Sequence, residues 1–202
     1  MSRIRQKNQD LIIEVASKQF ATHGYAATKM IDIAAAADIP KANVFYYFSS
    51  KDKLYNAVLE TVVQPLLEAS KPIEELSDPV EALSQYIQTK LMISRDHPNA
   101  SKVFANEVMS GANELPEPIA KELYKQSQMI MEKFAKWSEL GLMDDVPPHH
   151  LMFTIWAATQ TYADFSWQIC GVMKKKTLDD GDYAEAASFI TQLVIKGCGV
   201  KV

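Results

Sequence analysis

Lysines and aromatic rings are concentrated in one short stretch of the chain, KANVFYYFSSKDKLY, which spans residues 41–55. A lysine ammonium can donate hydrogen bonds to O6 and N7 of guanine, and an asparagine amide can pair with N6 and N7 of adenine. Tyrosine hydroxyls and further lysines can hold phosphates, which sets the position of a protein on a duplex. These residue types therefore indicate contact with double-stranded DNA.

Helical spacing decides which of these side chains can face outward. In a helix over about 41–48, Val44 and Phe48 lie one turn apart and can face the core together. A packed core between small helices is the alternative explanation for the rings, and we expect it to hold for Phe48 and Tyr55. The remaining positions are candidate DNA contacts, namely Lys41, Ala42, Asn43, Phe45, Tyr46 and Tyr47.

The segment before this stretch carries the signals of two more helices. A helix over about 8–23 ends at the glycine of THGY, and Thr28 has the residue type of an N-cap for a second helix that reaches Asp38. Pro40 then opens the third helix. Two short helices joined by ADIP have the layout of a helix-turn-helix, in which the second helix enters the major groove.

Only helical spacing recurs along the chain, and no segment alternates apolar and polar residues as a half-buried strand would. The predicted fold class is therefore all-α, with about nine helices. The apolar stripes of the first two helices are predicted to include Leu11 and Ile31. Caps, prolines and glycines place the later helices. One follows a cap at Ser49 or Ser50, one follows Asp78, one starts at Pro98 and one ends before Gly141, and the last two span about 149–170 and 182–197.

Charge is distributed unevenly along the 202 residues, although the formal net charge is −4. Residues 1–60 carry eight Lys and Arg against six Asp and Glu, and the first seven residues hold three cations and no acid. A short basic segment of this kind can lie against phosphates. A solvated, floppy terminus is the alternative.

Residues 28–54, TKMIDIAAAADIPKANVFYYFSSKDKL, resemble the DNA-binding signature of the tetracycline-repressor (TetR) family. The shared features are a threonine, an Ile-Ala pair, an alanine-rich turn, a tyrosine-phenylalanine pair and a Lys-x-x-Leu. The resemblance implies that residues 40–47 lie in the DNA groove. It adds contacts to the DNA backbone or its phosphates by Thr28, Lys29 and Lys51.

The resemblance also implies a DNA-binding domain at residues 1–52 and a ligand-binding and dimerisation domain at residues 53–202. Three residues depart from the pattern of the family. Asp38 stands where glycine is usual in the turn, and we expect it to adopt a left-handed conformation at a small cost. Pro40 replaces a serine or threonine and so lacks a hydroxyl for a cap or a phosphate, and Phe45 replaces a common phosphate-binding tyrosine.

The segment HHLMFTIWAATQTYADFSWQIC, residues 149–170, is apolar on more than one face. A surface helix needs only one apolar stripe, so this helix is predicted to be covered by its own domain and by a second subunit. The resemblance implies the same homodimer, built on the last two helices, whose recognition helices lie ~34 Å apart and read a palindromic operator. The last helix offers a seam at Ala186, Phe189, Ile190, Leu193 and Gly197.

Gln160 lies one turn from Trp156 within this segment. A buried amide without a partner costs ~1–3 kcal/mol, so we expect Gln160 to pair with another group. An amide beside an indole face would suit a planar ring with an amide edge, such as a pyrimidine. The alternative is that Gln160 bonds a neighbouring backbone carbonyl while Trp156 belongs to the core.

Residues 90–112 and 150–165 resemble the ligand domain of the pyrimidine-utilisation repressors, a subgroup of the TetR family whose effector is uracil or thymine. The resemblance implies a pocket lined by Trp156 and Gln160, in which Lys90 contacts a carbonyl. The segment SRDHP has a structural alternative, because its arginine and aspartate can pair to hold a turn.

Several other function classes lack support in the sequence. No segment approaches the ~20 apolar residues that span a bilayer, and two cysteines are too few for a disulfide framework, so we expect a cytoplasmic protein. No catalytic motif, phosphate-binding glycine loop or metal-ligand spacing is present, and no cofactor is expected. The prediction is a ligand-responsive transcriptional repressor. A helical enzyme or small-molecule-binding protein without DNA binding, and a protein-interaction module, are the alternatives.

Overall fold

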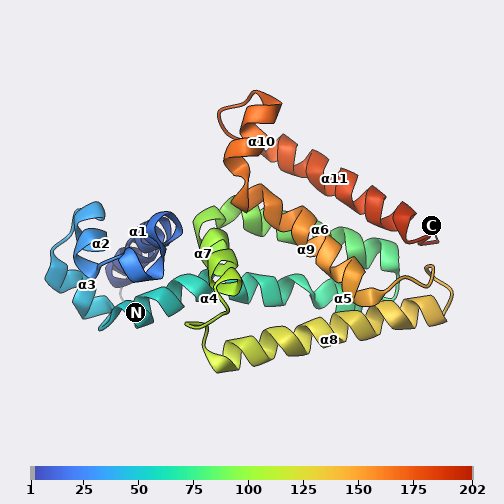
Figure 1. Ribbon diagram of the computed structural model, residues 1–202, viewed down its shortest axis with the longest axis horizontal. Coiled ribbons are helices and arrows are strands. Elements are labelled where there is room, and N and C mark those ends of the chain that lie inside the picture. The colour runs from blue at the N-terminus through green and yellow to red at the C-terminus, as the bar shows by residue number, and fades with distance from the viewer. Residues whose placement is uncertain (1–2, 202) are drawn as a thin grey trace. The chain divides into compact units, whose positions relative to one another are not determined.

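The computed structural model describes residues 3–201 and folds them into helices, with no strand among these residues (Figure 1). The all-α prediction is confirmed. Met1 and Ser2, which belong to the predicted basic segment, and Val202 lie outside the described residues. No helix within residues 3–201 is both long and apolar enough to cross a bilayer. The helices are α1 (Arg3–Ala27), α2 (Met30–Ala36), α3 (Lys41–Tyr47), α4 (Lys51–Ala69), α5 (Lys71–Glu75), α6 (Pro79–Asp96), α7 (Pro98–Met109), α8 (Glu117–Glu139), α9 (Pro148–Asp164), α10 (Ser166–Met173) and α11 (Asp180–Gly197).

Two short helices, α5 and α10, raise the number within residues 3–201 from the predicted nine to eleven. The helix predicted over 149–170 ends as α9 at Asp164, and α10 follows it. Phe165 between them has φ −107° and ψ 26°, which lies outside the helical region. Neither proline nor glycine occurs at this point, so the sequence carries no breaker signal for the end of α9.

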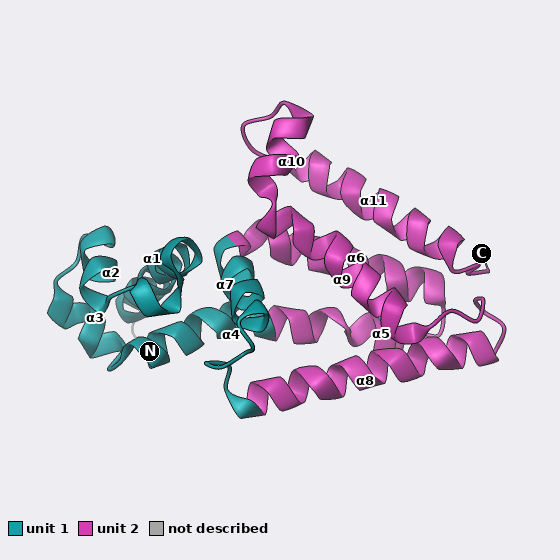
Figure 2. Ribbon diagram, in the orientation of Figure 1, with its two compact units in different colours: residues 1–63, 99–117 teal, residues 64–98, 118–202 magenta. Residues whose placement is uncertain are grey.

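By their contacts the helices form two compact units, and each unit combines two stretches of the chain (Figure 2). The first unit holds the residues up to Val63 together with Asn99–Glu117. The second holds Gln64–Pro98 together with Pro118–Val202. A single cut along the sequence therefore does not separate the units, and the predicted boundary between residues 52 and 53 falls inside the first unit.

The core of the first unit is apolar and draws on α1, α2 and α3. Val44 and Phe48, which the helical spacing predicts to face inward, are 0% and 5% exposed. Leu11 and Ile31 are 39% and 52% exposed, so their predicted place in the core-facing stripes is wrong. Their neighbours fill the core instead, because the buried stripes run through Ile12, Ala16, Phe20, Met30, Ile33 and Ala34.

A buried hydrogen-bond network explains why α7 belongs to the first unit. The Tyr55 hydroxyl of α4 donates to Oε2 of Glu107 at 2.8 Å, and the backbone N–H of Glu114 donates to Oε1 at 2.6 Å. Glu107 is only 5% exposed, but each carboxylate oxygen has a donor, which offsets much of the cost of its burial. Burial, and next the hydrogen bond to Glu107, raises the pKa of Tyr55 above its ordinary value.

Backbone hydrogen bonds shape the connection between α2 and α3. The N–H of Ile39 donates to the Ala34 carbonyl at 3.1 Å, and the N–H of Asp38 donates to the Ala35 carbonyl at 3.2 Å. These two bonds make a Schellman motif, which requires a left-handed residue after the helix. Asp38 is that residue, with φ 53°, so its predicted conformation is confirmed.

The second unit is built around α6, which packs against α9 and α11. Asp78 begins α6 as the sequence predicts, since its carboxylate accepts the Val80 N–H at 3.0 Å. Near the other end of α6, the Ser94 hydroxyl donates to the Thr159 carbonyl of α9 at 3.0 Å. This pairing of α6 with α9 brings together the helices that carry the predicted ligand residues.

We expect Asp38→Gly to raise the free energy of unfolding by up to ~1 kcal/mol, because a left-handed conformation strains an L-residue but not glycine. Urea unfolding of the full chain, followed by circular dichroism, measures this change. Asp32→Gly, at an exposed position inside α2, is the matched control and should lower the same quantity by roughly 0.5 kcal/mol. A loss of stability at both positions would contradict the described turn.

Candidate nucleic-acid interface and buried lysine cluster

The outer side of α3 presents most of the predicted DNA contacts to solvent. Helical spacing places Ala42 and Tyr46 opposite Val44, which is fully buried. Tyr46 is the most exposed aromatic residue of α3, with 68% of its surface exposed. Eight of the nine predicted residues are exposed or partly buried, namely Lys29, Lys41, Ala42, Asn43, Phe45, Tyr46, Tyr47 and Lys51.

Cations lie over the rings on this surface. The Lys41 ammonium is 5.5 Å from the centre of the Phe45 ring, and the Arg5 guanidinium is 5.6 Å from the centre of the Tyr46 ring. Tyr46 and Tyr47 meet edge to face with their centres 5.2 Å apart. Such contacts restrain long side chains at an exposed surface. The surface therefore offers positive charge, an amide and hydroxyls on partly ordered side chains.

Thr28 is buried, with 3% of its surface exposed, and does not cap α2. Its hydroxyl donates to the Gly24 carbonyl at 2.8 Å, while Lys29 stands at the N-cap without a side-chain bond. The predicted N-cap is therefore wrong. Gly24, with φ 75°, interrupts α1, and its carbonyl accepts the Thr28 hydroxyl instead. A backbone contact of Thr28 with DNA stays a prediction from the family resemblance.

The Lys51 side chain donates a hydrogen bond to the protein backbone inside the first unit. Its ammonium donates to the Tyr25 carbonyl at 2.9 Å and lies 4.2 Å from the centre of the Tyr25 ring. The last turn of a helix carries partial negative charge, which favours a cation there. The Tyr25 hydroxyl donates to Asp52, and that bond is the first cause that raises the pKa of Tyr25. Lys51 thus holds α4 to the end of α1, and its phosphate contact stays a prediction.

A buried lysine lies on α6 in the second unit. Lys90 is 9% exposed, and no carboxylate in residues 3–201 forms an ion pair with it. Burial lowers the pKa of Lys90 to about 8. The ring of Tyr86, one turn earlier on α6, has its centre 5.8 Å from the ammonium. A buried ammonium without an anion favours any molecule that brings an acceptor oxygen.

Trp156 of α9 contacts Tyr86, the aromatic neighbour of Lys90. Its indole N–H donates to the Tyr86 hydroxyl at 2.9 Å, and burial raises the pKa of Tyr86 to about 12. We call Tyr86, Lys90 and Trp156 the lysine cluster. The structure therefore brings together two of the three predicted ligand residues. Tyr86 is the member that sequence reasoning missed, although its position four residues before Lys90 places it on the same side of α6.

Gln160 lies one turn beyond Trp156 and is partly buried. Its side-chain amide donates to Oδ1 of Asp164 at 3.0 Å. The expected partner for this amide is therefore present on the next turn of α9, as a carboxylate. Sequence spacing carries a signal for this pair, because residues 160 and 164 are four apart on one helix.

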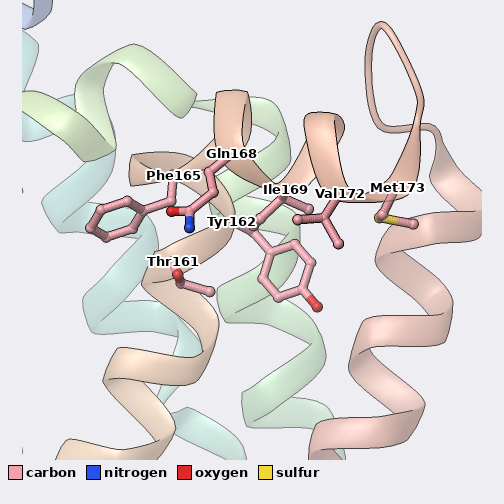
Figure 3. Close-up of a pocket in the computed structure, with 7 residues that line it drawn as sticks. All are labelled: Thr161, Tyr162, Phe165, Gln168, Ile169, Val172 and Met173. Carbon is pink, nitrogen blue, oxygen red and sulfur yellow. The ribbon is translucent and has the colours of Figure 1, made fainter.

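An apolar pocket of about 490 Å³ opens on α9 and α10 (Figure 3). Figure 3 shows the Tyr162 ring and the side chains of Val172 and Met173 along its wall. A second pocket, of about 530 Å³, lies between α6 and α11. None of the three predicted ligand residues lines either pocket. Among residues 3–201, no group of three or more His, Cys, Asp and Glu could hold a metal ion.

The structural alternative for SRDHP is confirmed. Nε of Arg95 pairs with Oδ1 of Asp96 at 2.7 Å, and its Nη1 reaches Oδ1 of Asp180 at 3.0 Å. Arg95 also lines the pocket between α6 and α11. The segment therefore links the end of α6 to the start of α11, and these exposed pairs contribute little stability by themselves.

Large apolar side chains remain exposed on the last three helices. Two members of the predicted dimer seam, Ala186 and Ile190, are buried within the subunit, because that side of α11 faces α6. The other side of α11 and the outer side of α9 and α10 stay open. The most exposed large residues there are Phe153, Phe165, Trp167, Val172, Phe189 and Leu193, from 50% to 89% exposed.

Comparison with known protein families divides the chain into two parts. The family described as "Bacterial regulatory proteins, tetR family" matches residues 12–58. The family described as "YcdC-like protein, C-terminal region" matches residues 59–201. The HTH-type transcriptional regulator RutR of Escherichia coli strain K12 is 34% identical over 199 residues, which cover 97% of this chain and 92% of the relative.

Solved structures share the fold at lower identity. The ketosteroid transcriptional regulator KstR2 of Mycobacterium tuberculosis superposes with a TM-score of 0.79 at 17% identity, covering 100% of this chain and 97% of its own. AibR in complex with isovaleryl coenzyme A and operator DNA superposes with a TM-score of 0.68 at 20% identity, covering 92% and 96%. At this level of identity, the likeness shows the all-helical fold.

We expect Lys90→Met to raise the free energy of unfolding at pH 7 by on the order of 1–3 kcal/mol, because it removes a buried charge and keeps an unbranched chain. Lys90 has a folded pKa of about 8, below its ordinary value, so the unfolded chain binds more protons between about pH 8 and 10.5. The stability of the wild type therefore rises across that range, and the difference between the two proteins shrinks.

Urea unfolding at a series of pH values measures the effect of Lys90→Met. Lys125→Met, at an exposed position of α8 in the same unit, is the matched control and should change stability by less than ~0.5 kcal/mol. A loss of stability in Lys90→Met at pH 7 would show that the ammonium is stabilised where it lies.

Proposed function

The chain belongs to the TetR family of bacterial regulatory proteins, and we propose that it is a transcriptional repressor that binds operator DNA as a homodimer and responds to a small planar effector. It is a DNA-binding regulator and not an enzyme. The observation that carries the DNA-binding part is the outer side of α3, where Lys41, Asn43 and Tyr46 are all exposed within the family signature. We further propose that the protein acts in the cytoplasm.

Each exposed group on α3 has a chemical counterpart on a duplex. Lys41 and Asn43, at the start of the helix, suit the acceptors and donors of guanine and adenine in the major groove, and the Ala42 methyl suits a thymine methyl. Tyr46 and Tyr47 offer hydroxyls to phosphates on either side. Lys29, exposed before α2, adds a positive charge for the backbone.

In the proposed domain organisation, residues 1–52 bind DNA, and residues 53–202 bind the effector and form the dimer. The family matches at residues 12–58 and 59–201 support a boundary near this point. Because α7 packs within the first unit, the second range also supplies part of the body that carries α3.

We propose that the exposed apolar surface of α9, α10 and α11 is the dimer interface. Phe153, Phe189 and Leu193 present large apolar groups that water solvates poorly, and such surfaces mark sites of association. A twofold axis through this surface would present two copies of α3, which must lie ~34 Å apart to enter successive turns of the major groove. The operator is then palindromic.

The lysine cluster is the proposed effector site. The Lys90 ammonium has no carboxylate partner in residues 3–201. A carbonyl or anionic oxygen of a ligand would therefore supply the acceptor that the ammonium lacks. The Trp156 ring offers a flat face, and the Gln160 amide lies one turn away. The resemblance of residues 90–112 and 150–165 to the pyrimidine-utilisation repressors favours uracil or thymine.

Effector binding can affect DNA binding through the helices that hold the site. A ligand between α6 and α9 would displace or share the bond from Trp156 to Tyr86, so it would favour a different spacing of these helices. Along the chain, only His97 separates α6 from α7, which belongs to the first unit. The effector releases DNA only if it binds better to the arrangement in which the two α3 helices do not fit a duplex.

We expect Asn43→Ala and Tyr46→Ala to weaken operator binding by at least about tenfold, because each removes a contact to a base or a phosphate. The probe is a duplex recovered from genomic DNA by selection with the wild-type protein, and fluorescence anisotropy gives its Kd. Size-exclusion chromatography of both variants should still show the dimer.

Lys18→Ala is the matched control for loss of a side chain on the same unit. Lys18 is exposed on α1, and it lies 13 residues beyond Arg5, or ~20 Å along the helix. Its removal should leave Kd within about twofold. Unchanged affinity in Asn43→Ala and Tyr46→Ala would count against α3 as the helix that enters the groove.

We expect uracil or thymine to raise the Tm of the wild-type protein by several degrees at concentrations ~100-fold above Kd. The shift should disappear in Lys90→Met and Gln160→Ala, since each loses a group of the proposed site. Dihydrouracil, which keeps the carbonyls but not the flat ring, is the matched control ligand. A shift that persists in both variants would place the ligand elsewhere, and no shift with any pyrimidine would refute this effector class.

A further inference from the structure

A hydrogen bond links the beginning of α1 to the end of α3. Nδ2 of Asn8 donates to the Tyr47 hydroxyl at 3.2 Å, and both side chains are partly buried. Tyr47 is the last residue of α3 and stands next to Tyr46 on the predicted DNA-facing surface. The sequence signature that begins at residue 28 does not include Asn8.

The direction of this bond decides whether the Tyr47 hydroxyl can still donate its hydrogen to another group. A tyrosine hydroxyl has one hydrogen to donate and two lone pairs, and it uses a lone pair to accept from Asn8. Within residues 3–201, the hydroxyl has no second hydrogen-bond partner. Its hydrogen therefore stays available for an acceptor outside the protein, and the oxygens of a DNA phosphate are acceptors only.

On the premise of the proposed function, we propose that Asn8 is a positioning residue for DNA binding, which holds Tyr47 and directs its hydroxyl hydrogen toward a phosphate. The DNA-facing surface then extends from α3 to the first turns of α1. Asn8 itself makes no contact with DNA and acts through Tyr47.

Charge at the start of α1 supports this extension. Helix α1 begins at Arg3, so the basic segment is helical over its described residues rather than floppy. Arg5 lies over the Tyr46 ring, as described above, and Asn8 binds Tyr47. Residues three apart share one side of a helix, so α1 reaches two consecutive tyrosines of α3 from a single side.

A double-mutant cycle separates this role from simple packing of α1 on α3. The full chain and the genomic duplex described above are used, with Kd measured between about 50 and 200 mM salt. Tyr47→Phe should weaken binding about three- to tenfold, because it deletes one hydrogen bond. Asn8→Ala should weaken it by less, and the double variant should bind no worse than Tyr47→Phe alone.

Salt dependence separates the loss of a neutral hydrogen bond from the loss of a charge that contacts a phosphate. Asn8→Ala and Tyr47→Phe remove no charge, so the slope of log Kd against log salt should match the wild type. Arg5→Ala should lower that slope by about one. Additive losses in the cycle, or no loss in Asn8→Ala, would overturn the proposal. Thermal unfolding of each variant shows whether a loss of binding reflects a loss of folded protein.

Asn8→Asp tests the direction of the bond. A carboxylate can only accept, so it would draw the Tyr47 hydrogen inward, and binding should fall further than in Asn8→Ala. Gln9→Glu places the same charge on the next residue, ~100° around the helix, and measures repulsion of phosphates alone. Equal losses in the two acidic variants would overturn the proposed direction. Failure of the wild type to select any duplex would instead refute the proposed function.

Discussion

The proposed action on DNA depends on a helix of only seven residues keeping its shape. An isolated helix of that length is unstable in water, because it forms too few hydrogen bonds to offset the cost of nucleation. Helix α3 persists because Val44 and Phe48 are almost fully buried and because the preceding turn satisfies its own backbone groups. Packing holds one side of the helix, which leaves the other side free to carry lysine, asparagine and tyrosine.

The two units differ in whether a buried charged group has partners. The Glu107 carboxylate has a donor for each oxygen, so it stabilises one arrangement of α4 and α7. The Lys90 ammonium lies beside rings, without an ion-pair partner among residues 3–201, and its pKa falls because of burial. One unit is therefore suited to act as a rigid body. The other contains a group whose free energy depends on what is bound, which is what a regulator requires.

Local patterns in the sequence predicted the features that local physics decides. Spacing identified the inner and outer sides of α3, and residue type was enough to place Asp38 in a left-handed turn. Features that depend on distant neighbours were missed. Lys51 donates to a carbonyl 26 residues earlier, and the Tyr86 hydroxyl accepts from an indole 70 residues later, so no local pattern contains either contact. The break at Phe165 was missed because the chain has neither proline nor glycine there.

Glu107 enters the first unit from a stretch of chain 52 residues beyond Tyr55, so the N-terminal helices are not a detachable module. A chimaera joined near residue 58, with the N-terminal helices of another family member, would set a buried carboxylate against a foreign surface. Recombination between relatives would then succeed only where this tyrosine and this glutamate are inherited together. The two positions are therefore expected to change as a pair during evolution.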